Sequence, residues 1–210
     1  MRIVAAQALE DWLKNGRILE KDARGPKVVA LESGSESGLF LKIFHTRRHP
    51  LLARLQPAAP RFAKNAQCLK KLGIPVPEII DSFWIPANPL TGRKCLSACL
   101  YRPLPGITLE SLFRQDPEAL YALLPDLARF IRRIHRKRIY FRSLHVGNIL
   151  SLPDGGFGLI DVLDLKRCLL PLGRWRIRRN FRHLTRHLAR SGLDDFPASE
   201  LCRLYYGKLT

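Results

Sequence analysis

A break in the chain at Pro103-Leu-Pro-Gly106 separates two parts with different patterns of apolar residues. Before the break, apolar residues fall mainly into short runs bounded by Gly, Pro and Ser, which is typical of antiparallel strands. After it, they recur mainly at helical spacing. We therefore predict an α+β fold of two small lobes: residues 1–102 form an antiparallel sheet with one helix, and residues 103–210 form a shortened, mainly helical lobe.

The first part carries signals for five strands and for that helix, and its opening segment also has apolar residues at helical spacing. The opening helix ends before the turn signal Asn15-Gly16, and the second helix ends at Gly73. The predicted strands are Arg17–Glu20, Lys27–Leu31, Leu39–Phe44, Ile79–Ile85 and Lys94–Tyr101, and the second helix is Pro60–Leu72.

The second part is predicted to be helical except for one hairpin. The hairpin strands lie within Ile139–Leu150 and Gly156–Val162, and the turn Pro153-Asp-Gly-Gly156 connects them. The predicted helices are Thr108–Phe113, Pro117–Lys137 and Arg174–Arg190.

The chain is strongly basic, with 36 Lys and Arg against 18 Asp and Glu and a net charge of +18. Nine of the basic residues lie between Lys166 and Arg190 without any acid, and six more lie between Arg129 and Arg138. Such a surplus predicts a polyanionic partner: nucleic acid, an anionic membrane surface or a phosphorylated glycolipid.

The cysteines and the N-terminus indicate a cytoplasmic protein. The five cysteines are odd in number and have no zinc-site spacing, so we expect reduced thiols, with Cys95 and Cys99 as small buried residues. Glu10 and Asp11 interrupt the stretch where a signal peptide needs apolar residues. No run is long enough to predict a transmembrane helix.

The stretch Ile139-Tyr-Phe-Arg-Ser-Leu-His-Val-Gly-Asn-Ile-Leu150, followed by Gly158-Leu-Ile-Asp-Val162, carries the clearest chemical signal. Asn148 ends a loop, and Asp161 ends the next strand 13 residues later. The two side chains can meet across a hairpin, and their oxygens are ligands that a divalent cation prefers. Taken alone, Asn148 could equally brace the loop.

This order of features resembles the protein-kinase-like superfamily, in which His-Arg-Asp-Leu-x-x-x-Asn precedes Asp-Phe-Gly. The resemblance implies that Asn148 and Asp161 bind Mg²⁺ and that Arg142 lies in the catalytic loop. Lys42 resembles the strand lysine that binds the phosphates of ATP. Two further segments resemble the junction after the first lobe's helix and the hinge: Gly73-Ile-Pro-Val-Pro77 and Tyr101-Arg-Pro-Leu-Pro-Gly106.

Small size and basicity point, within that superfamily, to the lipopolysaccharide core kinases, which phosphorylate heptose or Kdo. Proteins labelled toluene tolerance are similar as well. The resemblance implies ATP and Mg²⁺ as cofactors and an anionic glycolipid acceptor, or an anionic membrane surface, as the partner. It also allows attachment at the inner face of the cytoplasmic membrane.

The catalytic loop departs from the pattern at the position of the general base. Ser143 replaces the Asp that accepts the proton of the substrate hydroxyl, and Phe141 replaces the His. A serine hydroxyl is no base at neutral pH. A positioned base contributes about 10² to 10⁴ in rate, whereas phosphoryl transfer draws most of its catalysis from metal and charge placement.

Two residues are candidate substitutes for the missing base. Asp164 follows Asp161 by three residues, and His145 lies in the same loop as Ser143. Each has a plainer interpretation, which we favour: Asp164 would pair with Lys166 or Arg167, and His145 would hold the turn by hydrogen bonds.

The predicted nucleotide-binding part departs from the pattern as well. No acidic residue occurs between Lys42 and Glu78, so Asn65 or a neighbour stands where a helix glutamate normally pairs with the lysine. The turn after the first strand offers only Gly25 where kinases carry several glycines.

Three functions therefore remain open at this point. The first is an ATP-dependent sugar kinase of the lipopolysaccharide core. The second is a pseudokinase that serves as a nucleotide-binding scaffold or regulator in envelope assembly. A nucleic-acid-binding module is third, because no zinc finger, aromatic RNA-binding strand or helix-turn-helix accompanies the charge.

Overall fold

The computed structural model describes residues 2–45, 57–86 and 96–207. These residues form two compact units, one made of Met1–Lys71 with Pro77–Leu104 and the other of Leu72–Val76 with Pro105–Thr210. Strands and six α-helices are described, so the predicted α+β class is confirmed. The division at residue 102 into two kinase lobes stays a prediction.

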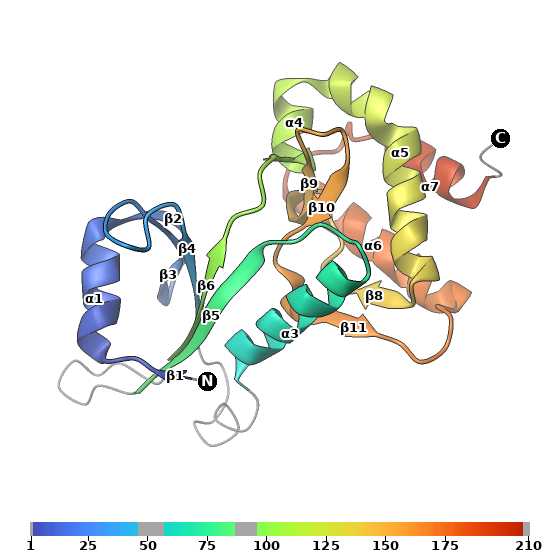
Figure 1. The fold of residues 1–210 in the computed structure, drawn as a ribbon. Coiled ribbons are helices and arrows are strands. Elements are labelled where there is room, and N and C mark those ends of the chain that lie inside the picture. The colour runs from blue at the N-terminus through green and yellow to red at the C-terminus, as the bar shows by residue number, and fades with distance from the viewer. Residues whose placement is uncertain (1, 46–56, 87–95, 208–210) are drawn as a thin grey trace. The chain divides into compact units, whose positions relative to one another are not determined.

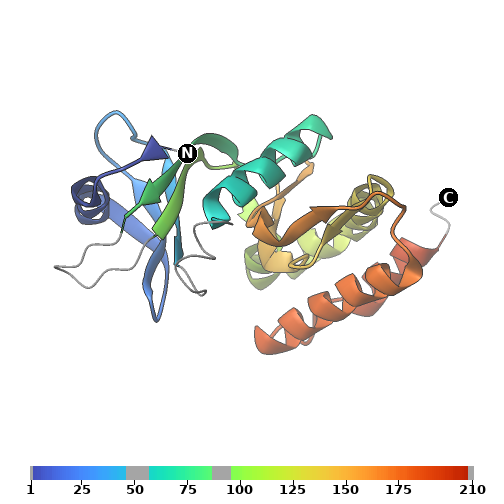
Figure 2. The same cartoon turned by 90° about the horizontal axis from the view of Figure 1, so that it is seen from below.

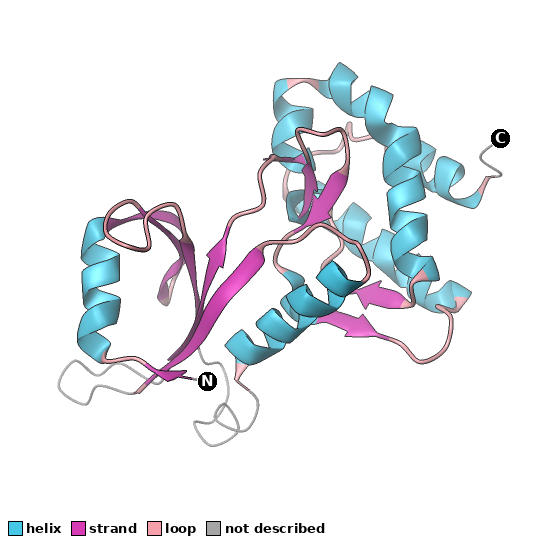
Figure 3. Ribbon diagram, viewed as in Figure 1, coloured by secondary structure: helices cyan, strands magenta, loops and turns pink. Residues whose placement is uncertain are grey.

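The first unit is built on a six-stranded sheet in the order β1-β5-β6-β4-β3-β2 (Figures 1 and 3). All pairs are antiparallel except β1 with β5. Its strands are β1 (Arg2–Ile3), β2 (Gly16–Asp22), β3 (Gly25–Leu31), β4 (Phe40–His45), β5 (Glu78–Ile85) and β6 (Leu96–Arg102). Cys99 is buried in β6, and Cys95 lies outside the described residues.

The alternation of side chains along β4 and β6 gives the sheet two apolar faces. On one face, Leu41 and its neighbours form a core with Leu9 of helix α1 (Ala6–Asn15). On the other face, the ring of Phe62 in helix α3 (Ala58–Lys71) packs at a tilt against the ring of Phe44, with 5.6 Å between the ring centroids. Each helix thus covers a face that would otherwise expose apolar side chains.

The connection between β2 and β3 is a turn of two residues. Asp22 pairs with Gly25 in the register of the two strands, and Gly25 has φ of +120°, a backbone conformation that favours glycine. The Asp22 side chain accepts a hydrogen bond from the Arg24 amide at 2.8 Å, which closes the turn locally.

The second unit surrounds short strands with helices α4 (Leu109–Gln115), α5 (Pro117–Arg136), α6 (Arg174–Arg190) and α7 (Ala198–Tyr206). Helix α7, which the sequence analysis did not predict, packs beside α5 (Figures 1 and 2). The strands are β7 (Ile107–Thr108), β8 (Ile139–Phe141), β9 (Ile149–Ser151), β10 (Phe157–Leu159) and β11 (Leu165–Arg167). They form one three-stranded sheet, β10-β9-β7, and one pair, β11-β8.

A buried hydrogen-bond network joins three of these helices to β8. The His135 ring lies between the Tyr205 hydroxyl, 2.7 Å from Nδ1, and Asn180 Oδ1, 3.1 Å from Nε2. Asn180 Nδ2 in turn donates to the carbonyl of Phe141 at 2.7 Å. The neutral Nε2–H tautomer of His135 satisfies both ring nitrogens, and burial lowers its pKa to about 4.

Acidification should therefore destabilise this unit. Because the pKa of His135 is lower in the folded state, the unfolded chain binds more protons between about pH 6.5 and pH 4, and stability falls as the pH falls through this window. Thermal unfolding measured across this range should show a decreasing midpoint. His135→Gln, which does not titrate, should show a shallower dependence, and an unchanged slope would contradict the assignment to His135.

Candidate active site

Asn148 is held in a fixed orientation at the end of the loop that follows β8. The short 3₁₀-helix η2 (Val146–Asn148) carries it, and its side chain is buried. Nδ2 donates to the carbonyl of Ser143 at 2.9 Å and lies 3.1 Å from Nε2 of His145. In the described part of the chain, no hydrogen bond is made to Asn148 Oδ1, so this oxygen remains available as a ligand.

Asp161 lies at the same end of the β9–β10 hairpin as Asn148. The pairing of Ile149 with Leu159 and the hydrogen bond from the Ile160 amide to the Asn148 carbonyl, at 3.0 Å, place the two residues side by side. Asp161 has φ of +50°, a left-handed conformation that is uncommon outside glycine and that Asp adopts more readily than most other residues. Strained backbone of this kind clusters at functional sites, which supports the choice of Asp161.

The side chains of Asn148 and Asp161 fit the Mg²⁺ that the sequence pattern implies. They supply one amide oxygen and one carboxylate, and Mg²⁺ is usually held by one or two carboxylates together with water and substrate phosphates. Among the residues that the structure describes, no cluster of three or more His, Cys, Asp or Glu could hold a metal by itself. Binding of Mg²⁺ by Asn148 and Asp161 stays a prediction, in which water and substrate phosphates would supply the other ligands.

The carboxylate of Asp164 lies beside Ser143, the residue at the position of the general base. Ser143 Oγ donates to Asp164 Oδ2 at 3.2 Å, and Arg142 binds the same oxygen at 2.9 Å. The register of β8 with β11 explains this contact, because the pair Phe141 and Leu165 brings the residues next to them together. The plainer interpretation favoured above, a pair with Lys166 or Arg167, is therefore replaced by a pair with Arg142.

His145 lies in an aromatic and acidic environment that suits a structural role. Its ring stacks on His187, with 3.8 Å between the centroids, and His187 Nε2 lies 3.0 Å from Glu110 Oε2. Burial, together with the nearby His187, lowers the pKa of His145 to about 4. A histidine with this pKa is a weak base, and its Nε2 is already engaged with Asn148. His145 therefore orients Asn148 in preference to accepting a substrate proton.

The sequence analysis missed Glu110 and His187, which support the loop from α4 and α6. A Cβ added at Gly147 would lie 2.9 Å from Glu110 Oε2, so a side chain there would displace this carboxylate.

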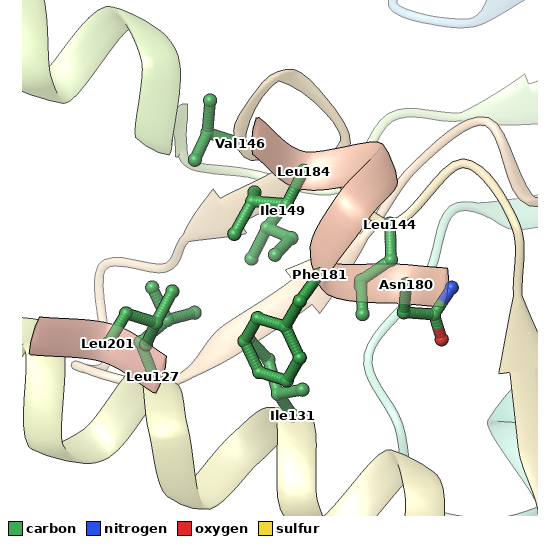
Figure 4. A pocket seen from close by; sticks show the side chains of 9 residues that line it. All are labelled: Leu127, Ile131, Leu144, Val146, Ile149, Asn180, Phe181, Leu184 and Leu201. Carbon is green, nitrogen blue, oxygen red and sulfur yellow. The ribbon is translucent and has the colours of Figure 1, made fainter. Parts of the chain in front are cut away.

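Beneath the loop, apolar side chains from several segments converge (Figure 4). They are Leu127, Ile131, Leu144, Val146, Ile149, Phe181, Leu184 and Leu201.

Lys42 belongs to the first unit and is held on the α3 side of the sheet. Its Nζ lies 5.8 Å from the ring centroid of Phe62 and 6.0 Å from that of Phe44. The side chain is half-buried. Asn65, which stands near the expected place of the helix glutamate, lies on α3 and is also half-buried. The binding of ATP phosphates by Lys42 stays a prediction.

Comparison with known proteins identifies the class. Residues 15–142, more than half of the chain, match the phosphotransferase enzyme family (APH), and the chain belongs to this family. The predicted kinase-like phosphotransferase fold is thus confirmed. The matched residues include Lys42 and end at Arg142, before Asn148 and Asp161.

Among solved structures, the chain is similar to WaaP in a structure titled as a complex with acyl carrier protein. The two are 20% identical, with a TM-score of 0.48, and the match covers 95% of this chain and 92% of that chain. No curated protein matches the sequence. A membrane-spanning helix is not found among the described residues.

The metal-site assignment predicts a ligand-dependent change in stability. ATP with Mg²⁺ should raise the thermal midpoint of the wild-type protein, since a ligand that binds only the folded state stabilises it. Asp161→Asn should lose most of this increase, because the exposed carboxylate is the charged ligand. Asp154→Asn, in the turn of the same hairpin, is the matched control and should keep it. Equal increases in all three proteins would contradict the assignment.

Proposed function

We propose that the protein is an ATP-dependent phosphotransferase that phosphorylates a sugar hydroxyl of an anionic glycolipid, with the lipopolysaccharide core as the acceptor. The observation that carries the proposal is the Asp164 carboxylate 3.2 Å from Ser143 Oγ. The catalytic loop lacks the general-base Asp because Ser143 replaces it. A carboxylate beside Ser143 can supply the missing base. Membership of the phosphotransferase family supports the type of reaction.

In the proposed reaction, Asp164 accepts the proton of the acceptor hydroxyl. The hydroxyl oxygen bonds to the γ-phosphorus of ATP while the bond to the leaving ADP oxygen breaks. Arg142 holds the Asp164 carboxylate in place through its 2.9 Å contact. Lys42 is assigned to the phosphates, and Asn148 and Asp161 are assigned to Mg²⁺, which neutralises charge on the phosphates when bound.

The charge of the chain supports an anionic acceptor. Net charge is +18, and α6 alone contributes seven arginines. A phosphorylated glycolipid at the inner face of the cytoplasmic membrane matches this surplus in sign and would bring the acceptor to the protein. The location at this face is part of the proposal.

A pseudokinase is the second candidate, and the same contact favours it in one respect. Arg142 and Ser143 both bind Asp164 Oδ2, so the carboxylate could serve only to brace the β8–β11 pair. In that case the protein would bind ATP as a scaffold or regulator without turnover. Nucleic-acid binding has no support beyond charge.

Removal of the Asp164 carboxylate separates these candidates. Asp164→Asn keeps the size of the side chain and its ability to contact Ser143 but removes the base, so phosphotransfer to core oligosaccharide should fall by about 10² to 10⁴. The rate of transfer from ATP is the measurement, with nucleotide binding followed in parallel. Asp154→Asn should transfer at the wild-type rate.

Exchange of the two side chains gives a sharper test of the base. Ser143→Asp should lower the rate at neutral pH, because two carboxylates at hydrogen-bond distance repel one another and tend to share a proton. Adding Asp164→Ser to this variant should restore activity by returning one carboxylate to the pair. A rise in rate with Ser143→Asp alone would show that the wild-type site lacks a base. Wild-type protein that binds ATP but transfers no phosphate would leave the pseudokinase as the better description.

A further inference from the structure

Three large apolar side chains are exposed close together in the sequence at the start of α6. Leu169 is 90% exposed, Leu170 is 76% exposed and Trp175 is 66% exposed. These are the largest exposed fractions among the big apolar residues described in the second unit. Single exposed apolar residues are common, but three within seven positions form a feature that requires an explanation.

The backbone that carries Leu169 is fixed by hydrogen bonds on both sides. Arg138 Nη1 donates to the Leu169 carbonyl at 2.8 Å, and the Cys168 amide donates to the Arg138 carbonyl at 2.8 Å. Arg176, in the first turn of α6, lies 2.7 Å from the Cys168 sulfur. The leucines are therefore presented to solvent by an anchored segment.

A stripe of arginines continues from Trp175 along α6. The stripe consists of residues at helical spacing that line one groove together with Trp175 and His183: Arg178, Arg179, Arg182 and Arg186. Arg179 lies over the Trp175 ring at 5.2 Å. In the described part of the chain, no carboxylate is within salt-bridge distance of the seven α6 arginines. By contrast, Arg142 before the helix and Arg203 after it each pair with a carboxylate.

The charge along this stripe is uncompensated. The pKa of His183 is lowered, first by burial and then by four arginines, of which Arg179 and Arg186 belong to the stripe. Arg142 and Arg190 are the other two. The largest of these influences include no acidic residue, which indicates a positive potential along the stripe.

We propose that Leu169, Leu170 and Trp175 insert into the interface of an anionic phospholipid bilayer while the arginine stripe binds the lipid headgroups. The inference deepens the proposed membrane location and does not depend on phosphotransfer. Leucine side chains gain free energy in the acyl region, tryptophan favours the headgroup level, and arginine pairs with phosphate. A nucleic acid would use the arginines, but it would contact Leu169 and Leu170 only where bases are unstacked.

The two contributions differ in their response to salt, and this gives the proposal its test. The attraction of each basic residue to an anionic surface is screened by salt, whereas apolar insertion is not screened. Burial of the two leucine side chains adds a favourable contribution that does not depend on charge. Binding should therefore weaken with salt but persist in part.

The experiment is co-sedimentation with vesicles of phosphatidylcholine alone and of phosphatidylcholine mixed with phosphatidylglycerol. Wild-type protein should bind the mixed vesicles at least about tenfold more strongly than vesicles of phosphatidylcholine alone. Leu169→Ser with Leu170→Ser should bind them at least about tenfold more weakly and should be released completely by salt. The control pair is Ile18→Ser with Leu19→Ser, two adjacent apolar residues that are 46% and 41% exposed in the first unit.

Charge reversal tests the arginine stripe in the same assay. Arg178→Glu with Arg182→Glu should lower binding to the mixed vesicles to the level seen with phosphatidylcholine alone. Arg61→Glu with Lys64→Glu, two exposed residues on α3, changes the net charge equally and should bind as the wild type does. Trp175 emission should shift to shorter wavelength on binding, and Trp175→Phe should abolish that shift.

Three results would overturn the proposal. The first is equal sedimentation with both vesicle types. The second is wild-type binding by the Leu169→Ser, Leu170→Ser protein, which would leave a purely electrostatic surface. The third is binding to single-stranded RNA that displaces the vesicles and is unaffected by the leucine changes, which would favour nucleic acid as the occupant. The assay measures vesicle binding and does not measure phosphotransfer. A lack of vesicle binding can therefore be distinguished from a lack of phosphotransfer activity.

Discussion

The hydrogen bonds from Tyr205 through His135 and Asn180 to the Phe141 carbonyl hold the second unit together at the point where the candidate loop begins. Buried polar groups that are fully paired specify one arrangement of the elements that carry them, because any other arrangement leaves a donor or acceptor without a partner. Helices α5, α6 and α7 thereby determine where β8 ends. The positions of Ser143 and Asn148 follow from that end point. The pairing of β11 with β8 also depends on it.

Local patterns in the sequence predict most of the first unit and part of the second. The short apolar run in 39–44, interrupted only by Lys42, predicts the strand that carries this lysine, and Gly73 marks the end of α3. The loop and hairpin around Asn148 follow from the turn at 153–156 and from the family pattern. Helix α7 escapes such reasoning because its short apolar pattern, Ala198–Tyr206, becomes stable mainly through packing against α5.

The contact between Ser143 and Asp164 could not be derived from the sequence, although both residues drew attention. It depends on strand register, and a shift of one residue between β8 and β11 would turn Asp164 to the other side. The support of His145 by His187 and Glu110 has the same origin, because it joins residues from three separate elements. Patterns within one segment identify candidate groups, whereas pairing between distant segments decides which of them meet.

The two-residue turn between β2 and β3 has a consequence for how long a nucleotide would remain bound. A turn this short presents few backbone N–H groups, whereas a glycine-rich loop covers the phosphates with several. Affinity would then rest largely on the cation and on side-chain charge, and little protein would have to move for the nucleotide to leave. If the protein binds ATP as proposed, it should exchange nucleotide rapidly and respond to the free Mg²⁺ concentration around it. The fraction of the protein that has nucleotide bound would then follow the cellular ATP concentration closely.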